Sequence, residues 1–430
     1  MTVFLDTADP GFERAFADLL GSKRESSVEV GETVASIVAD VRERGDAALI
    51  ELTKKFDRLS LTPETLRVSK TEIEAAWDAT PPEVREALEF AHRRITAHHE
   101  KQKPHDHIYT DEIGVTLGTR WTPIEAVGLY VPGGLASYPS SVLMNAVPAK
   151  VAGVERLAMT VPAPGGEINP AILAAARIAG VDEIYRVGGA QAIAALAFGT
   201  DTIVPVYKIV GPGNAYVATA KRQVFGAVGI DMIAGPSEVL VIADETANPA
   251  WVAADLLAQA EHGAGAQSIV MTTSRELAGA VVAEVGRQVA TLRAPDNARD
   301  GWEEFGAVIV ARDLDEAADL ANRVASEHVE LAVDDPQALM PKIRNAGAIF
   351  LGHHTPEAIG DYVGGSNHVL PTARSARFAS GLGVLDFVKR TSVLGCTPTA
   401  LGALADATVT LAETERLEAH GRSVSIRLNR

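Results

Sequence analysis

The feature that most constrains the fold is a regular alternation of apolar runs and helical segments in the middle of the chain. The runs 126–131 (AVGLYV) and 156–162 (RLAMTVP) are each followed by a turn and a segment with helical periodicity. One such segment, 170–181, has Asn169 as its expected N-cap and Pro170 as its first residue. Continuous apolar strands that alternate with helices indicate a parallel sheet with helices on both faces. The sequence therefore predicts a doubly wound α/β fold, in which ligands bind beyond the carboxyl ends of the strands.

A second array of the same kind runs from 237–244 (SEVLVIAD) to 347–353 (GAIFLGH). We therefore expect two parallel-sheet, incompletely Rossmann-like domains with small extensions at both ends. The expected boundaries are 1–27 for an N-terminal helical extension, 28–124 with 239–380 for the first α/β domain, 125–238 for the second, and 381–430 for a C-terminal tail. Helical periodicity further predicts helices over 9–20, 28–45, 46–56, 70–79 and 81–102. The tail is expected to form a strand, two helices and a short strand.

The balance of charges limits the classes of partner. The 430 residues include 39 basic and 56 acidic side chains, which gives a formal net charge of −17. Such a chain repels nucleic acid and anionic membranes, and this favours a function that acts on small molecules. The N-terminal stretch has acids where a signal peptide needs a basic start, and no apolar run is long enough to span a bilayer. We expect a cytoplasmic protein that binds neither nucleic acid nor membrane.

Two groups of potential metal-binding side chains give little evidence of a metal site. The single cysteine, Cys396, excludes an intrachain disulfide and a cysteine-rich zinc site, and we expect it to be buried. The histidines His98, His99, His105 and His107 form a loose cluster that has no acid at a useful spacing. We interpret them as solvated residues near the end of a helix.

Three loops follow expected strands of the first array, at 130–134, 188–192 and 211–215. The last of them opens a helix, so its backbone N–H groups can meet a phosphate. Its GPGN sequence is not the GxGxxG dinucleotide fingerprint, and no acid follows at the distance that would bind a ribose. The pattern alone is equally compatible with phosphate binding and with ordinary turns.

The residues around these loops resemble a known family. The strings 128–154 (GLYVPGGLASYPSSVLMNAVPAKVAGV), 187–200 (VGGAQAIAALAFGT) and 208–224 (KIVGPGNAYVATAKRQV) are similar to the histidinol dehydrogenase family, and the similarity covers nearly the whole chain. The resemblance implies a zinc- and NAD-dependent enzyme that oxidises L-histidinol to L-histidine through a bound aldehyde, the last step of histidine biosynthesis. It also implies an intertwined homodimer. It assigns the NAD contacts to Tyr130, Gln191 and Asn214.

The stretch 255–263 (DLLAQAEHG) reads as the last turns of a helix that Gly263 ends. Residues three apart share a face of a helix, so Gln259 and His262 point the same way, and both can bind a divalent metal. A capped surface helix whose His262 interacts with the helix dipole explains the same residues. The resemblance favours the metal. It implies a zinc site whose ligands are Gln259, His262, Asp361 and His420.

Glu327 and His328 are expected to close a helix before the strand 329–333 (VELAV). For an isolated pair, the attraction of a histidine to the end of a helix is the simpler explanation. A carboxylate beside an imidazole is also a natural acid–base set, and the segment 321–331 (ANRVASEHVEL) matches the family's catalytic segment. By resemblance, His328 is the base of the oxidation steps and Glu327 activates water.

The segment 356–372 is rich in Gly, Ser and Asn, so we expect a loop, and loops on a rigid scaffold collect binding groups. A helix over 413–420 is expected to carry two further polar candidates near the end of the chain. The resemblance makes His420 the fourth zinc ligand, supplied by the partner subunit. It assigns the substrate contacts to Ser237, Gln259, His262, His328, Glu357, Asp361, His368, Glu415 and His420.

Three other functions are compatible with parts of the sequence. A zinc hydrolase can use the same ligands and a neighbouring acid, but it has no need of the three cofactor loops. A catalytically inactive relative should have lost ligands or the acid–base pair, and neither loss is seen. A sulfonate dehydrogenase of the same superfamily is disfavoured because Glu357, His368 and Glu415 match the histidinol pocket. Departures from the common family pattern at 261–268 (EHGAGAQS) and 358–359 remove no functional group.

Overall fold

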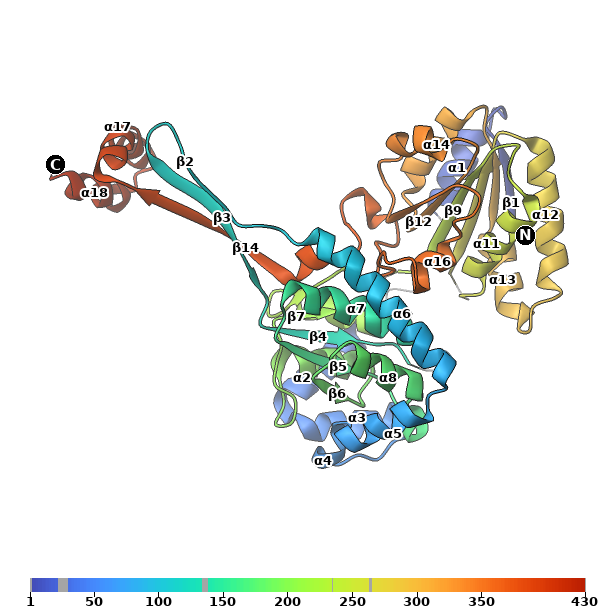
Figure 1. Ribbon diagram of the computed structural model, residues 1–430, viewed down its shortest axis with the longest axis horizontal. Helices are drawn as coiled ribbons and strands as arrows, with labels where there is room; N and C mark the ends of the chain where they lie inside the picture. The colour runs from blue at the N-terminus through green and yellow to red at the C-terminus, as the bar shows by residue number, and fades with distance from the viewer. Residues whose placement is uncertain (1, 22–29, 134–137, 234, 263–264, 430) are drawn as a thin grey trace.

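The computed structural model describes residues 2–21, 30–133, 138–233, 235–262 and 265–429. It has two α/β bodies and a long arm that carries the C-terminus away from both (Figure 1). We name the bodies the six-stranded body and the five-stranded body after their sheets. The expected fold class is confirmed, because each sheet is parallel and is packed by helices on both faces. Within the described ranges, no helix combines the length and apolar character that a membrane crossing requires.

The six-stranded body has a core on each face of its sheet. Its strand order is β1 (Val3–Asp6), β11 (Ala307–Val310), β10 (Gln267–Thr272), β9 (Glu238–Ala243), β12 (His328–Ala332) and β13 (Ala348–Leu351). Val239 and Val241 of β9 face one core, and Leu240 and Ile242 face the other, as the two-residue period of a strand requires. The helices of the first core are α11 (Pro249–Ala260), α12 (Arg275–Val289) and α13 (Pro295–Phe305), and those of the second are α1 (Phe12–Gly21) and α14 (Leu314–Val324).

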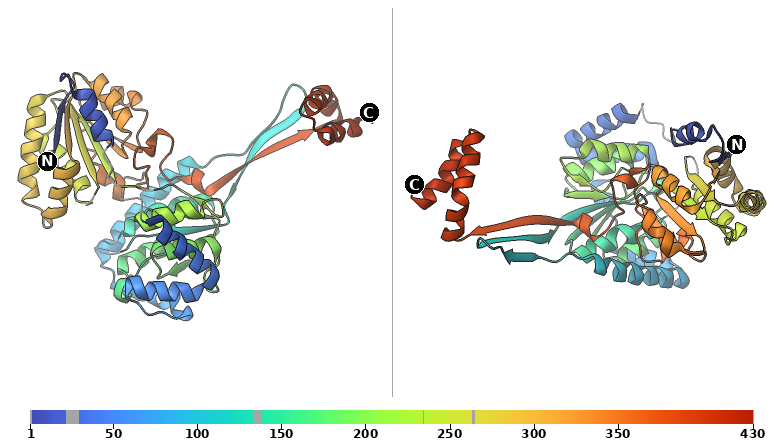
Figure 2. Two further views of the ribbon diagram at one scale, coloured as in Figure 1. Left: turned by 180° about the vertical axis from the view of Figure 1, so that it is seen from behind. Right: turned by 90° about the horizontal axis from the view of Figure 1, so that it is seen from above.

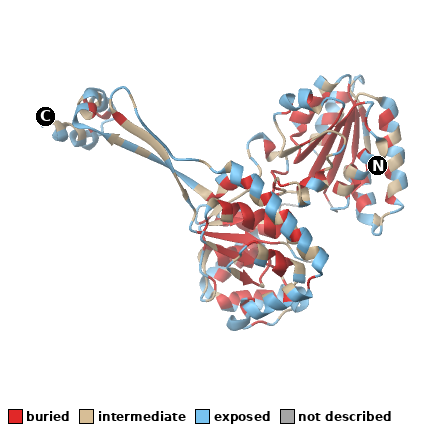
Figure 3. Cartoon of the chain, in the orientation of Figure 1, coloured by how far each residue is buried: buried red, intermediate tan, exposed pale blue. Residues whose placement is uncertain are grey.

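The five-stranded body repeats this arrangement. Its strand order is β6 (Glu183–Tyr185), β5 (Arg156–Thr160), β4 (Ala126–Tyr130), β7 (Lys208–Val210) and β8 (Gly229–Ile230). One core is formed with α5 (Lys70–Ala79), α6 (Pro82–His99), α7 (Pro139–Ala152) and α8 (Pro170–Ile178). The other is formed with α2 (Val30–Arg44), α3 (Asp46–Asp57), α9 (Gly189–Phe198) and α10 (Ala215–Val224). The inner strands β4, β9, β10, β11 and β12 are buried from end to end (Figure 3), whereas the edge strands β1, β8 and β13 are partly exposed.

The packing of the first hundred residues corrects the expected grouping of 28–124 with 239–380. Val34 and Leu49, from α2 and α3, share a core with Ile209 of the five-stranded body. Ile95 of α6 shares the opposite core of the same body with Val127. The expected N-terminal helical extension is also different, since β1 pairs with β11 and belongs to the six-stranded sheet. The apolar face of a helix does not specify which of two similar sheets it will cover.

The arm is a three-stranded antiparallel sheet capped by two helices. Its strands are β2 (His107–Thr110), β3 (Val115–Pro123) and β14 (Val388–Cys396), and its helices are α17 (Pro398–Thr414) and α18 (Glu418–Ser425). Both views of Figure 2 show it projecting from the bodies, and Figure 3 shows that little of it is buried. Sequence patterns predicted neither the β2–β3 hairpin nor its pairing with β14. Cys396 was expected to be buried and is exposed.

Several local expectations also differ from the structure. A left-handed residue, Ala325 (φ 51), ends α14 early, so His328 begins a strand instead of closing a helix. The expected loop 356–372 contains the short helix α16 (Glu357–Tyr362). The expected helix 413–420 is broken between α17 and α18, and the last residues form a 3-10 turn instead of a strand. His99 is fully buried and is not a solvated residue. Gly263 lies outside the described residues, and α11 ends at Ala260.

Candidate active site

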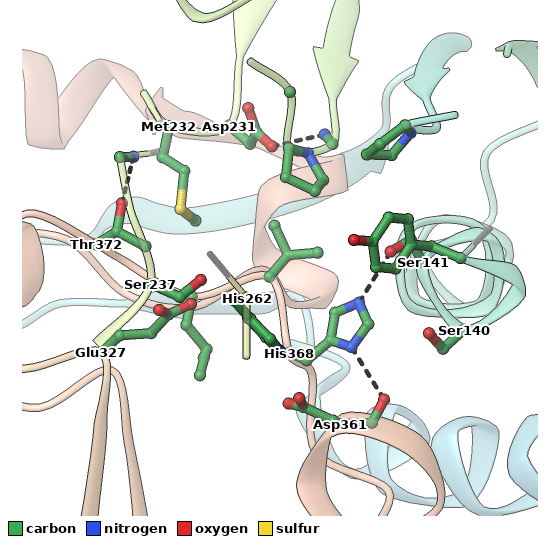
Figure 4. Close-up of a pocket in the computed structure, with 18 of the residues that line it drawn as sticks. Ser140, Ser141, Asp231, Met232, Ser237, His262, Glu327, Asp361, His368 and Thr372 are labelled. Atoms are coloured by element: carbon green, nitrogen blue, oxygen red, sulfur yellow. Dashed lines mark hydrogen bonds between the residues drawn. The ribbon is translucent and has the colours of Figure 1, made fainter. Parts of the chain in front are cut away.

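A cavity of about 300 Å³ lies where the two bodies meet, and it collects most of the expected catalytic residues (Figure 4). A volume of this order suits a small-molecule ligand. The five-stranded body contributes Pro132, Ser141 and the loop 211–214 to its wall. The six-stranded body contributes Ser237, His262, Glu327, His328, Asp361 and His368.

The strands of the two sheets face this cavity with opposite ends, carboxyl ends in one body and amino ends in the other. In the five-stranded body, the loop 211–214 follows β7 and so lies at the carboxyl end of the strands, as a doubly wound sheet predicts. In the six-stranded body, Ser237 precedes β9 and Glu327 precedes β12, and these strands are neighbours with His328 opposite Val239. The acid–base candidates therefore lie at the amino ends of their strands, and the expectation of carboxyl-end binding is wrong for this sheet.

His328 is held with one ring nitrogen directed at the cavity. Its Nδ1 lies 3.0 Å from the carbonyl oxygen of Glu238. Because a carbonyl only accepts, Nδ1 carries the proton in the neutral ring and Nε2 has a free lone pair. Nε2 is buried without a hydrogen-bond partner and lies 3.8 Å from Oδ1 of Asp361. Burial lowers the pKa of His328 below its ordinary value, so the ring is kept neutral and ready to accept a proton.

Glu327 provides a second proton acceptor beside this ring. Its Oε2 accepts a hydrogen bond of 3.0 Å from the backbone N–H of Glu238 and lies 3.8 Å from Nδ1 of His328. Burial raises the pKa of Glu327 well above its ordinary value, and the N–H of Glu238 opposes part of that shift. A carboxyl group with a raised pKa takes up and returns protons more readily near neutral pH than an ordinary glutamate does.

Three further acids stand behind His328. Oε2 of Glu357 lies 3.5 Å from Nδ1 of His328, and the backbone N–H of Glu357 donates to Oε1 of Glu330 at 2.7 Å. Burial raises the pKa of Glu357 and that of Glu330, and it raises the pKa of Asp255, a neighbour of Glu330, to about 6. Sequence patterns did not reveal Asp255 or Glu330, because each is a single acid within an otherwise apolar element.

His368 joins the two bodies at the cavity. Its Nδ1 donates to the backbone carbonyl of Asp361 at 2.9 Å, which leaves Nε2 to accept from the hydroxyl of Ser141 at 3.3 Å (Figure 4). Ser141 belongs to α7, on the other body. Arg94 of α6 also crosses between the bodies, and donates to two carbonyl groups of the loop that leads to His368, each at 2.8 Å. The ring therefore has a fixed tautomer and a fixed position.

The expected zinc ligands are present only in part within one chain. His262 and Asp361 line the cavity. Gln259, one helical turn before His262, is fully buried, and neither polar atom of its side chain has a hydrogen-bond partner. Since buried polar groups are otherwise nearly always paired, this amide fits a position that awaits a cation. Among the described residues, no three His, Cys, Asp or Glu side chains come together closely enough to hold a metal ion.

The remaining expected ligand lies far from the cavity of its own chain. His420 is in α18, and Glu415 directly follows α17; both are exposed. Figure 1 shows these helices at the tip of the arm, well away from both bodies. Within one chain, the structure does not bring either residue to the other site residues.

The three expected cofactor contacts do come together. Tyr130, Gln191 and Asn214 line a second cavity of about 340 Å³ in the five-stranded body. The hydroxyl of Tyr130 accepts from the N–H of Gly189 at 3.1 Å, and burial raises the pKa of Tyr130 to about 12. The side chain of Asn214 caps α10 by accepting from two backbone N–H groups. Asn214 lines both cavities, so a ligand in the second cavity can extend into the first.

A buried ion pair that the sequence analysis did not single out fixes the loop between the two cavities. Lys221 and Asp231 form the pair, and both are almost fully buried. Lys221 Nζ donates to the carbonyl of Gly211 at 2.9 Å, and Oδ2 of Asp231 accepts from the N–H of Gly211 at 2.8 Å. At φ +114 a Cβ on Gly211 would lie 2.1 Å from the carbonyl oxygen of Tyr130, so only glycine fits this position.

The chain closely resembles proteins of known activity. A family model described as histidinol dehydrogenase matches residues 21–428. The histidinol dehydrogenases of Agrobacterium fabrum and Rhizobium meliloti are 66% and 64% identical to it, with 100% of this chain and 99% of each relative covered. A crystal structure of histidinol dehydrogenase from Elizabethkingia anophelis is 38% identical, has a TM-score of 0.95, and covers 100% of this chain and 98% of its own. The chain therefore belongs to the histidinol dehydrogenase family of NAD-dependent oxidoreductases.

Proposed function

We propose that the first cavity oxidises L-histidinol to L-histidine in two NAD-dependent steps, with a bound aldehyde between them. One observation carries the proposal. The free base nitrogen of His328, the carboxyl group of Glu327 and the cofactor-side residue Asn214 all line the same small cavity. An alcohol dehydrogenase needs a base beside its cofactor, and a four-electron oxidation needs a second proton acceptor for water.

In the first oxidation, the hydroxyl proton of histidinol passes to Nε2 of His328 while the hydride on the same carbon passes to NAD⁺. The Glu238 carbonyl holds the required tautomer throughout. The positive ring that forms is stabilised by Asp361, which acts on the pKa of His328 in the opposite direction to burial. His368 and Ser237, on the same wall, are proposed to contact the substrate.

In the second oxidation, Glu327 accepts a proton from water as the water oxygen bonds to the aldehyde carbon. The resulting hydrate anion loses its hydride to a second NAD⁺ and its hydroxyl proton to His328, which has by then released the first proton to solvent, and this leaves the carboxylate of histidine. Glu327 is suited to this step because the N–H of Glu238 holds its Oε2 in place and the residue lines the cavity.

We further propose one Zn²⁺ per subunit, held by Gln259, His262 and Asp361 of one chain and by His420 of a second. Nitrogen and oxygen ligands of this kind suit zinc. When bound, the ion would hold the imidazole and amine of the substrate and so orient the carbon that reacts. The proposal is supported by the unpaired buried amide of Gln259.

A homodimer is the assembly that this arrangement requires. The tip of the arm exposes large apolar side chains, with exposed fractions of 70% for Leu394, 63% for Leu411 and 55% for Ile426. Apolar surface gathered on a projecting element indicates a covering partner. We propose that each arm covers the other subunit, so that His420 and Glu415 reach the cavity of the partner.

The proposal is tested by the yield of NADH from a limiting amount of histidinol. We expect two NADH per histidinol, because the aldehyde stays bound and is oxidised again. A chelator should abolish the reaction, and added Zn²⁺ should restore it, with one Zn²⁺ per subunit by elemental analysis. A yield of one NADH would leave only an alcohol dehydrogenase. No absorbance change at 340 nm with histidinol and NAD⁺ would instead favour the zinc hydrolase.

Activity is expected to fall as the pH is lowered. His328 acts as a neutral ring, and its lowered pKa keeps it neutral to below its ordinary value of about 6.5. Glu327 acts as a carboxylate, and its raised pKa means that this form is lost at a higher pH than for an ordinary glutamate. We therefore expect Glu327 to set the acid limb of the second oxidation, and the first oxidation, whose base is His328, to keep its acid limb unchanged in Glu327→Gln. A profile of the second oxidation that is flat from about pH 6 to about pH 9 would contradict the role of Glu327.

A further inference from the structure

The cofactor cavity contains a carboxylate that the proposed reaction does not use. Asp57, the last residue of α3, lines this cavity with Tyr130, Gln191 and Asn214, although it is remote from all three in sequence. Its Oδ2 is buried and has no hydrogen-bond partner. Burial raises the pKa of Asp57 above its ordinary value.

The position of Asp57 is unfavourable in three separate ways. The carboxyl group is partly buried, one of its oxygens is unpaired, and it lies at the C-terminal end of a helix, where the helix dipole is negative. Asp46, at the other end of α3, shows the contrast. It lies in the first turn, where the dipole favours an acid, and although its Oδ1 is also buried without a partner, its Oδ2 accepts from the hydroxyl of Thr202. A ligand that donates hydrogen bonds would explain why Asp57 is tolerated where it stands.

The walls of the cavity indicate which donors that ligand has. Among its described lining residues there is no Lys or Arg, so a multiply charged anion would find no cationic side chain. The first turns of α9 and α10 open onto the cavity, and their backbone N–H groups that do not donate to Tyr130 or Asn214 can meet a pyrophosphate. Hydroxyl groups are the part of a dinucleotide that an isolated carboxylate can bind.

We propose that Asp57 accepts hydrogen bonds from the ribose hydroxyls of NAD and sets the preference of this enzyme for NAD over NADP. The inference rests on the proposed assignment of the second cavity to NAD. In NADP a phosphate replaces one of the ribose hydroxyls, and it would bring like charges together where no cation is available. In the common dinucleotide fold the acid follows the glycine loop at a fixed spacing. In this chain it precedes the sheet, which is why no acid was found at the expected distance.

The substitution Asp57→Asn in the full-length, zinc-loaded enzyme tests the proposal. It preserves the shape of the side chain and removes its charge. We expect NADH affinity, measured by fluorescence titration, to weaken by about tenfold. The KM for NAD should rise in parallel, while kcat should stay within about twofold of its normal value. We expect the KM for NADP to fall by about tenfold, because the repulsion is removed. The melting temperature should stay the same or rise, since the unfavourable position of the charge is relieved.

Glu51→Gln is the matched control. Glu51 is an exposed acid on the same helix and pairs with Arg44, outside the cavity, so the same charge change there should alter neither cofactor constant. The proposal is wrong if Asp57→Asn changes the KM values for NAD and NADP equally. It is also wrong if the variant has a lower melting temperature and binds neither cofactor, because Asp57 then has a structural role.

A second variant separates this inference from the proposed function. Gln191→Ala should weaken NADH binding whether or not Asp57 contacts the ribose, because Gln191 lines the same cavity. If Gln191→Ala leaves NADH affinity unchanged, the assignment of the cavity to NAD fails, and the inference fails with it. If Gln191→Ala weakens NADH binding while Asp57→Asn does not, only the inference about Asp57 fails.

Discussion

Replacing His328 with Asn is expected to slow both oxidations by about 10²- to 10⁴-fold, the usual contribution of a positioned general base. The amide of Asn can still donate to the Glu238 carbonyl, which receives Nδ1 of His328 at 3.0 Å in the structure. No atom of Asn replaces Nε2, the ring nitrogen that has no partner and faces Asp361. We therefore expect a folded variant that binds histidinol and NAD but transfers hydride slowly, as measured by single-turnover formation of NADH.

Glu327→Gln serves as the control for this result, because it affects a different step. The alcohol has no need of activated water, so the first NADH should form at close to the normal rate. The second NADH should form slowly, and the time course should show a burst of one NADH per site followed by a slow phase. A His328→Asn variant that keeps more than about a tenth of the normal single-turnover rate would rule out His328 as the base.

The parts of the fold that follow from local periodicity were predictable. Asn169 was expected to cap a helix, and its side chain accepts from the N–H of Ala171. The apolar runs that became β4 and β9 were recognised as strands because they are buried on both faces. Such patterns depend on residues a few positions apart, which the sequence displays directly.

The parts that were missed depend on contacts between distant segments. Nothing in α6 specifies that Ile95 packs beneath Val127 instead of on the other sheet. The hairpin of β2 and β3 is largely exposed and pairs with β14, which lies more than two hundred residues later. His99 looked like a solvated residue, but its Nδ1 donates to the Ile95 carbonyl inside the core.

The same distinction between local patterns and distant contacts applies to the residues of the candidate site. Motif strings were enough to name Tyr130, Gln191 and Asn214, and the structure brings them to one cavity. Asp57 lies outside the quoted strings, and Lys221 lies inside one but had no expected role, because an isolated charged residue in a helix gives no local sign of being buried. Their surroundings come from segments that approach only in the folded chain.

Mixing two inactive variants is expected to restore activity if the arm completes the site of the partner. His328→Asn removes the base from a body but leaves its arm intact, whereas His420→Asn removes a proposed ligand from an arm but leaves its body intact. In a mixed dimer, the body of the second chain meets the arm of the first, and that site is whole. Random assortment makes about half of the dimers mixed, each with one working site of two, so about a quarter of normal activity should return.

The physical basis of this prediction is the position of His420, which is exposed at the tip of an arm that points away from both bodies of its own chain. Co-refolding the two variants and measuring NADH formation against each variant alone gives the result directly. Glu327→Gln mixed with His328→Asn is the matched control, since both changes lie in the body and no assortment repairs a site. If His420 acts within its own subunit, the first mixture should be as inactive as the control, because every site then contains one of the two changes.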